Sequence, residues 1–260
     1  QSLRTKRQMS EGKMDKAAYK SRLKELQKRL NLLQHAMARQ GLNGIVVLEG
    51  WDAAGKGGVI RRIAWALDPR HLKVWSIGAP SPAEKRQHWL KRFWQRLPDE
   101  GEIAVFDRSW YGRVLVEPIE GFASREEAAR AYREINEFEN MLTDEGLRMV
   151  KLFLDITPQT QYRRFEKRFR SRQKRWKMTR EDLRNRARWR EYEEAYERMI
   201  AETSTPAAPW VRIDANEKRA ARLACLEEIL KVLGAGIDVT PPPADPEVKA
   251  FFDDRKNTKP

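Results

Sequence analysis

Residues 44–58, GIVVLEGWDAAGKGG, decide how this chain folds. The apolar stretch 44–49 is typical of a buried parallel strand, and residues 57–67 carry apolar side chains at helical spacing. Gly50 and Lys56 lie between these two segments and fit the spacing G-x-x-x-x-G-K. That motif forms a phosphate-binding loop when it follows a strand and precedes a helix, as it does here. The sequence therefore predicts a strand, loop and helix unit that binds phosphate.

The loop itself supplies most of the predicted phosphate contacts. Glycines let successive backbone N–H groups face one anion, and the dipole of the following helix adds to the attraction. We expect Lys56 to reach a bridging or terminal phosphate oxygen. We expect the other loop contacts to come from Gly50, Ala53, Ala54, Gly55, Gly57 and Gly58.

Position 57 departs from the usual motif in a way that concerns metal binding. Gly57 stands where the hydroxyl of a Ser or Thr usually binds Mg²⁺. Asp52 inside the loop is the natural replacement, and Asp107, at the end of the apolar run IAVFD, supplies a second carboxylate. We expect one or two Mg²⁺ ions between these two metal ligands. A structural Asp52 that caps the following helix is the alternative.

Two arginines follow Asp107 in the same loop. Arg108 and Arg113 can both stabilise charge on a transferred phosphoryl group, although Arg108 could also form an ion pair that holds Asp107. Phosphoryl transfer to a phosphate acceptor depends on alignment and charge neutralisation, because the attacking oxygen is already ionised. We therefore predict that Asp52, Lys56, Asp107 and Arg108 are catalytic.

Most of the net charge lies in one segment. Residues 161–190 contain 14 Lys or Arg and three acids, so they carry +11 of the net +14 of the whole chain. A localised field of this kind attracts a polyanion. The spacing predicts a helix that presents a ladder of cations toward the loop, like the closing lid of a small-molecule kinase. The predicted ladder consists of Arg164, Arg168, Arg172, Lys174 and Lys177.

The rest of the chain alternates predicted strands and helices. Strands are expected at 73–77, 103–107, 148–155 and 211–214, and helices at 15–39, 82–97, 124–145, from 158, from 179 and up to 234. This order predicts an α/β fold with a parallel sheet flanked by helices on both faces. We expect an N-terminal helical extension (1–40), a kinase core (41–236) with a basic lid at about 158–190, and an extended C-terminal tail (237–260).

Two details of this organisation remain open from sequence. The apolar stripe of residues 15–39 can pack on its own domain or form a coiled-coil contact with another subunit. In the tail, Phe251 and Phe252 can dock on the body or on a partner.

Composition narrows the setting of the protein. Hydrophobic residues make up 40% of the chain, enough for a sizeable core. The single cysteine, Cys225, allows no intrachain disulfide and is expected to be buried and chemically inert, which favours a cytoplasmic location. Neither a membrane span nor the apolar stretch of a signal peptide is visible, so we expect no contact with a membrane.

Three motifs together resemble the type 2 polyphosphate kinase family: GWDAAGKGG (residues 50–58), FDRSWYGRVLVE (106–117) and KRWKMTREDLRNR (174–186). The likeness extends from about residue 44 to residue 233. It implies a P-loop kinase fold with a helical lid, usually oligomeric, that transfers a phosphoryl group reversibly between inorganic polyphosphate and a nucleoside mono- or diphosphate with Mg²⁺. The adenine nucleotides AMP and ADP are the expected acceptors, and GMP and GDP are the alternative. The family's functional positions match Asp52, Lys56, Asp107 and Arg108, and Glu117 falls on a family carboxylate that is followed here by Pro118.

Two other functions remain open at this stage. An ATP-using nucleoside monophosphate kinase would share the loop, the metal and the lid, but it would not need a segment with a charge of +11. A nucleic-acid-binding P-loop protein could stack bases on Trp176 and Trp189 between the cations. We do not expect nucleic acid as a partner, because both tryptophans also suit a helix core.

Overall fold

A computed structural model describes residues 14–257 of the chain. Its centre is a five-stranded sheet in the order β2-β3-β1-β4-β5, and all of its pairings are parallel. The strands are β1 (Gly44–Gly50), β2 (Leu72–Ser76), β3 (Ile103–Asp107), β4 (Arg148–Asp155) and β5 (Trp210–Asp214). The predicted α/β class with a parallel sheet is confirmed.

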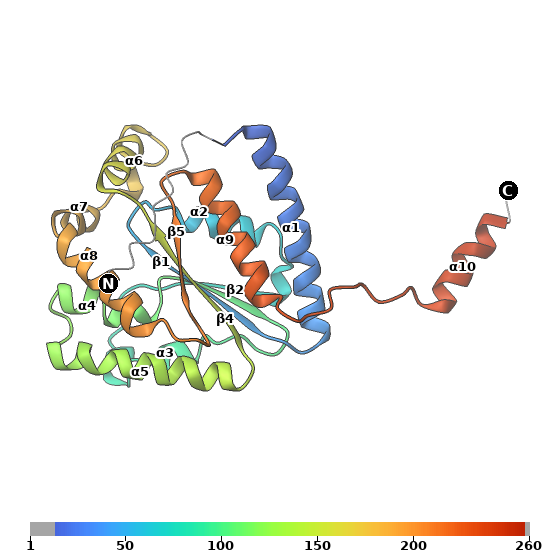
Figure 1. Ribbon diagram of the computed structural model, residues 1–260, viewed down its shortest axis with the longest axis horizontal. Helices are drawn as coiled ribbons and strands as arrows, with labels where there is room; N and C mark the ends of the chain where they lie inside the picture. The colour runs from blue at the N-terminus through green and yellow to red at the C-terminus, as the bar shows by residue number, and fades with distance from the viewer. Residues whose placement is uncertain (1–13, 258–260) are drawn as a thin grey trace, which may run out of the picture.

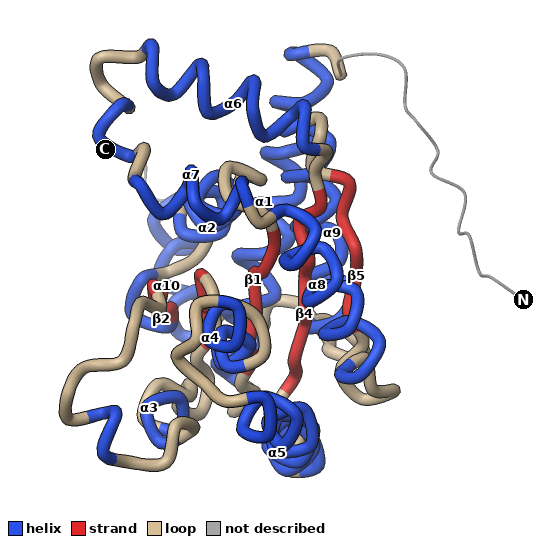
Figure 2. The backbone as a smooth tube through the Cα atoms, turned by 90° about the vertical axis from the view of Figure 1, so that its left-hand side faces the viewer, coloured by secondary structure: helices blue, strands red, loops and turns tan. Residues whose placement is uncertain are grey.

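Helices cover both faces of this sheet (Figure 1). One face carries α1 (Lys16–Arg39), α2 (Lys56–Ala64) and α9 (Lys218–Leu233), and the other carries α3 (Lys91–Trp94), α4 (Val116–Ile119), α5 (Arg125–Asp144) and α8 (Trp189–Thr203). Two more helices, α6 (Pro158–Arg170) and α7 (Arg180–Ala187), lie beyond the carboxyl ends of the strands (Figure 2). None of the helices in this described part is long and apolar enough to cross a membrane.

Helix α1 packs on its own chain. It begins after Asp15, whose carboxylate accepts a hydrogen bond from the backbone N–H of Ala18 at 2.8 Å. Its apolar stripe belongs to the single core cluster and faces α9 and α2. The buried members of the stripe are Tyr19, Leu26, Leu30, Leu33 and Met37. The interpretation that this stripe packs on its own domain is therefore confirmed.

Strand β1 is buried along its whole length between β3 and β4. Its last residue, Gly50, has a φ of +131°, and a Cβ atom there would lie 2.3 Å from the backbone oxygen of Leu154. Only glycine permits this close approach of the phosphate loop to β4.

The predicted helix at 82–97 is wrong in its extent. A 3-10 turn (Glu84–Arg86) ends at Gln87, whose backbone is extended, and the short helix α3 follows. Arg92 also donates to the backbone oxygen of Gly78 at 3.0 Å, which ties this segment to a loop. Phe93 is buried as predicted, but Trp94 is 44% exposed.

The basic segment does not form one long helix as predicted. Helix α6 ends at Arg170, because Ser171 adopts an extended backbone. A short 3-10 turn (Arg175–Lys177) follows, and Thr179 then caps α7 with a capping box. Repulsion along a continuous ladder of cations opposes a longer helix. Arg172, Lys174 and Lys177 therefore lie on a connecting loop.

The C-terminal tail is only partly extended. Residues 238–245 have no regular secondary structure, but α10 (Pro246–Asn257) follows them, which corrects the expectation of an extended tail. Figure 1 shows this helix standing away from the body. Phe251 is 52% and Phe252 58% exposed.

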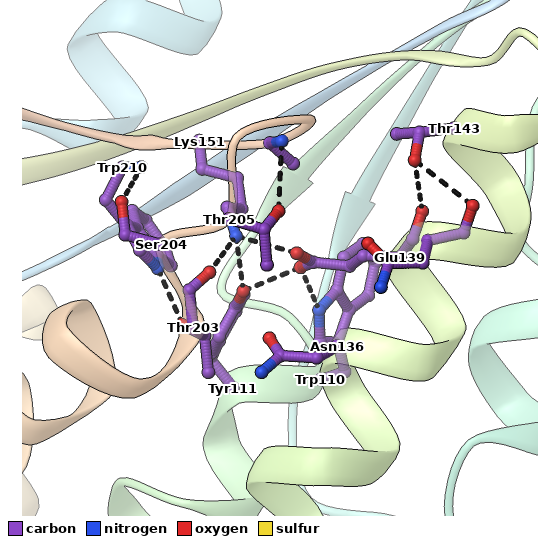
Figure 3. A network of polar contacts seen from close by, with 12 residues as sticks. Trp110, Tyr111, Asn136, Glu139, Thr143, Lys151, Thr203, Ser204, Thr205 and Trp210 are labelled. Carbon is purple, nitrogen blue, oxygen red and sulfur yellow. Dashed lines mark hydrogen bonds and ion pairs between the residues drawn. The ribbon is translucent and has the colours of Figure 1, made fainter.

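A buried polar network ties the segment after β3 to the core (Figure 3). The ammonium of Lys151 on β4 donates to Glu139 on α5 at 2.6 Å, to the Tyr111 hydroxyl at 2.9 Å and to the Thr203 backbone oxygen at 2.7 Å. Trp110 donates to the same carboxylate at 3.0 Å. All three ammonium hydrogens are thus used. Because Trp110 and Tyr111 follow Arg108 closely, the network fixes the position of that segment.

Candidate active site

The phosphate loop leaves β1 and turns into α2 at the carboxyl edge of the sheet. Ala53 has a φ of +62°, a backbone conformation that residues other than glycine rarely adopt. The ammonium of Lys56 donates to the backbone oxygen of Gly50 at 2.6 Å, so this side chain folds over its own loop. Gly55 and Gly57 have open space around the Cα atom, while Gly58 faces the guanidinium of Arg222.

Trp51 fixes the loop against α8 and β4. Its ring stacks on Trp189 with a centroid distance of 3.5 Å and an interplanar angle of 3°. Its indole N–H donates to Asp155 at 3.0 Å. Such a stack of two large rings, with the polar end of one of them satisfied, gives the loop a rigid support.

Asp52 is held at both carboxylate oxygens. Arg108 donates to Oδ1 at 3.2 Å, and the amide of Asn185 on α7 donates to Oδ2 at 3.0 Å. Arg108 itself has a φ of +63°, so the backbone is turned to bring this side chain over the loop. Burial lowers the pKa of the Arg108 guanidinium, but the negative charges of Asp52 and Glu49 raise it by more. The pKa of this group is therefore raised.

Glu49 is a site residue that the sequence analysis missed. It is the last side chain before the loop, it is only 4% exposed, and it accepts a hydrogen bond from the Ser109 hydroxyl at 2.9 Å. Burial raises the pKa of its carboxyl, and Lys56 and Arg108 work in the opposite direction. A charged residue at the end of an otherwise apolar strand was the available signal.

The carboxylates at this edge fit a Mg²⁺ ion that arrives with phosphate. Glu49 and Asp52 line one cleft. Asp107 ends β3 beside them and is close enough to raise the pKa of Glu49. Within residues 14–257 no group of three or more His, Cys, Asp or Glu side chains could hold a metal alone. Mg²⁺ is normally bound by one or two carboxylates together with waters and substrate phosphates, so this donor set suits it.

Helix α6 is anchored directly to the phosphate loop. Gln161 donates to the backbone oxygen of Asp52 at 3.2 Å. Arg164 donates to the backbone oxygens of Ala53 and Ala54, at 3.0 and 2.8 Å, and also to those of Ala215 and Asn216. Burial, followed by repulsion from Arg163 and Arg222, lowers the pKa of Arg164 to about 10. This arginine therefore joins the loop, α6 and the segment after β5.

Helix α7 closes the cleft from above. Its Glu181 and Asn185 line the cleft together with Asp52 and Arg108, and the cleft, which is partly open to solvent, measures about 60 Å³. A water molecule occupies about 30 Å³ in the liquid, and sites for small organic ligands measure about 300 Å³ or more. In this arrangement the cleft is too small to enclose a nucleotide. Asn185 was not predicted, because a single Asn in a basic run carries no sequence signal.

A second group of cations gathers at the N-terminus of α9. Lys218 lies among Arg164, Arg168 and Arg222, and partial burial followed by this repulsion lowers the pKa of its ammonium to about 8. Cations gathered without enough acids to balance them are typical of a binding site for anions. The sequence analysis assigned no role to Lys218 or Arg222.

The remaining predicted site residues lie at different distances from the cleft. Arg113 forms ion pairs with Glu117 at 2.8 Å and Glu127 at 3.1 Å, so it braces α4 and α5. Arg168 is partly exposed beside Phe165 on α6, whereas Lys174 and Lys177 are exposed on the loop between α6 and α7. The geometry brings Asp52 and Arg108 together at the cleft, with Lys56 folded over the adjoining loop, and it places Lys174 and Lys177 on the exposed segment before α7. Their roles in binding stay predictions.

Comparison with known proteins identifies what the chain resembles. The family model described as Polyphosphate kinase 2 (PPK2) matches residues 13–237. A polyphosphate:AMP phosphotransferase of Pseudomonas aeruginosa is 48% identical over 217 residues, which is 83% of this chain and 44% of that protein. An ADP-polyphosphate phosphotransferase 2 of Rhizobium meliloti is 43% identical over 79% of this chain and 67% of its own. This chain thus spans less than half the length of the AMP phosphotransferase.

Two solved structures agree with this match. A putative polyphosphate kinase 2 from Pseudomonas aeruginosa superposes with a TM-score of 0.83 at 46% identity, covering 86% of this chain and 48% of that one. A polyphosphate kinase 2 from Arthrobacter aurescens superposes with a TM-score of 0.85 at 34% identity, covering 93% and 87%.

Proposed function

Because the chain belongs to the polyphosphate kinase 2 family, we propose that it transfers a phosphoryl group reversibly between inorganic polyphosphate and a nucleoside mono- or diphosphate. The single observation that carries this proposal is the cleft. There the phosphate loop, Asp52 and Arg108 meet directly beneath a segment of charge +11. The relatives named for AMP and ADP make adenine nucleotides the first acceptors to test.

The chemistry is assigned to charge neutralisation and alignment. Lys56 exchanges the backbone oxygen of Gly50 for a phosphate oxygen, and Arg108 neutralises charge on the phosphoryl group in transfer. Backbone N–H groups of the loop and the start of α2 hold the neighbouring phosphate. Bound Mg²⁺, held by Asp52 and Asp107, would add neutralising charge on the phosphate oxygens.

The polyphosphate chain is assigned to the cations beside the loop. Lys218, Arg222 and Arg168 lie close enough together to repel one another, and successive phosphates would offset that repulsion. The exposed Lys174 and Lys177 extend the same field outward. An ATP-using kinase has no need for such a path, so the extended basic surface favours polyphosphate as donor.

Entry of a nucleotide requires that α7 moves. The cleft of about 60 Å³ cannot enclose one, while α6 is anchored to the loop through Arg164. We therefore assign the lid motion to α7 and the loop before it, with α6 staying in place. Assembly into a homo-oligomer and a cytoplasmic location stay predictions. The single cysteine, Cys225, is buried and forms no disulfide.

The decisive experiment supplies polyphosphate as the only phosphoryl donor. Purified protein is incubated with Mg²⁺, long-chain polyphosphate and AMP, ADP, GMP or GDP separately, and the nucleotides formed are followed over time. We expect ADP or ATP to appear without any added nucleoside triphosphate. The Asp52→Asn variant is the matched control, and it should lose most of this activity. Turnover that appears only when ATP is supplied would contradict the proposal.

A further inference from the structure

One contact of the catalytic aspartate comes from an element far away in sequence. Asn185 on α7 donates its amide N–H to Asp52 Oδ2 at 3.0 Å, 133 positions along the chain. Arg108 occupies the other oxygen, at the longer distance of 3.2 Å. Two donors on two different oxygens fix the plane of a carboxylate, whereas one long contact leaves it free to pivot. Each oxygen keeps a second lone pair for a further ligand.

The orientation of Asn185 is itself fixed. The hydroxyl of Tyr192, on α8, donates to the amide oxygen of Asn185 at 3.2 Å, so the amide nitrogen must face Asp52. Tyr192 is only 5% exposed. Burial, followed by the negative charges of Glu120 and Asp52, raises the pKa of Tyr192 to about 12, so the hydroxyl keeps its proton. The three side chains form one directed line of hydrogen bonds that ends on Asp52.

Helix α7 is also fastened from its other side. Arg184 contacts Glu120, in the turn that ends α4, at 2.9 Å, and Arg188 contacts the same carboxylate at 3.5 Å. The Glu120 side chain is only 8% exposed, so these ion pairs are partly shielded from solvent. They hold α7 where Asn185 reaches the loop. The hydrogen bond from Asn185 to Asp52 therefore exists only while α7 covers the cleft.

From this geometry we propose that Tyr192 and Asn185 are positioning residues that orient Asp52 toward Mg²⁺ bound with the nucleotide. The proposal rests on the role of Asp52 given under the proposed function. Its consequence is that α7 assembles the metal site as it covers the cleft, since Asn185 leaves Asp52 when α7 lifts. Partners that orient the ligands of a metal typically contribute 10-fold to 100-fold in metal affinity or activity.

The test compares nucleotide binding with and without the metal. Calorimetry measures the affinity for ADP in Mg²⁺ and, separately, in EDTA, for the wild type and for Asn185→Ala, Tyr192→Phe and the double variant. We expect Asn185→Ala to weaken binding in Mg²⁺ by about 10-fold or more and to leave binding in EDTA unchanged. Tyr192→Phe should have a smaller effect of the same kind. The double variant should equal Asn185→Ala, because Tyr192 acts through Asn185.

A matched control removes an equivalent amide elsewhere. Asn136 donates to the backbone oxygen of Glu202 at 2.9 Å, away from the cleft, and Asn136→Ala should leave both affinities unchanged. Thermal unfolding confirms that each variant is folded. Equal losses with and without Mg²⁺, or effects of the two variants that multiply, would overturn the proposal. This binding readout does not depend on the phosphoryl donor, so it holds even if polyphosphate proves not to be the substrate.

Discussion

The side chain of Lys218 makes the proposed polyphosphate path sensitive to pH. Its ammonium has a pKa of about 8, lowered by partial burial and by the neighbouring arginines. It is charged below that pH and neutral above it, and a polyanion prefers the charged form. We predict that the affinity for polyphosphate falls as the pH rises above about 8, by at most about tenfold per pH unit because one proton is involved. Calorimetric titration with polyphosphate across this pH range measures the slope.

A second lysine on the same helix provides the control for this prediction. Lys231 lies in the last turn of α9 with a side chain that is 74% exposed. Lys231→Met should keep the step near pH 8, while Lys218→Met should remove it and bind more weakly at every pH. Salt weakens the repulsion around Lys218, because the residue reaches solvent. A step that persists unchanged in Lys218→Met would exclude this residue as its source.

A buried ion pair fixes the position of helix α5 against strand β4. Lys151 and Glu139 are both fully buried, the ammonium uses all three of its hydrogens, and the carboxylate accepts from Lys151, Trp110 and Tyr111 (Figure 3). Removing one partner leaves the other charge buried without compensation, which typically costs about 3–5 kcal/mol. We predict a loss of this size for Glu139→Gln and for Lys151→Met in urea unfolding. The double variant Glu139→Gln with Lys151→Met should recover much of the loss.

The same helix carries a pair that differs mainly in exposure. Arg133 and Glu137 on α5 lie 3.5 Å apart with side chains 71% and 63% exposed. Exposed pairs contribute about 0–1 kcal/mol, so Glu137→Gln should change stability by less than about 1 kcal/mol. Losses at Lys151 and Glu139 that simply add in the double variant would show that the two charges are not coupled.

Elements with a repeating pattern could be predicted from the sequence. The strand and loop at 44–58, the stripe on α1 and the helix predicted at 124–145 were all recognised, because each depends on neighbours a few residues apart. The segment 82–97 was not, since the extended backbone of Gln87 interrupts it and the spacing of its apolar residues does not reveal that break. The prediction of one helix with a continuous basic ladder was also wrong, because helical spacing does not reveal the repulsion between neighbouring cations.

The same distinction between local patterns and tertiary contacts applies to the site residues. Asp52, Lys56, Asp107 and Arg108 lie within or beside motifs and could be named from sequence. Asn185 reaches Asp52 across 133 positions, and only the packing of α7 on the loop creates that contact. Glu49 carries a local signal, a charge at the end of an apolar strand, but its burial at the site became known only from the structure. Contacts made by tertiary packing leave no local pattern in a single sequence.

The charge distribution of the whole chain separates the two proposed substrates. Residues 161–190 carry +11 and the rest of the chain +3, so a long polyanion meets most of the field while a nucleotide meets the phosphate loop alone. Cations that neutralise phosphates release counter-ions, and binding then weakens steeply with salt. The KM for polyphosphate should therefore depend on ionic strength far more than the KM for the nucleotide.

The size of this difference follows from the number of phosphates contacted. For four contacts and a slope of about −0.7 each, raising the salt from about 50 to about 200 mM should increase the KM for polyphosphate roughly 50-fold. The KM for ADP, measured at constant free Mg²⁺, should change only a few fold. Arg168→Gln should reduce the slope by about one contact, because the α6 side chain belongs to the cation group at Lys218. The exposed Arg133→Gln on α5 should leave the slope unchanged. Equal salt slopes for both substrates would show that the basic segment does not bind the polyphosphate chain.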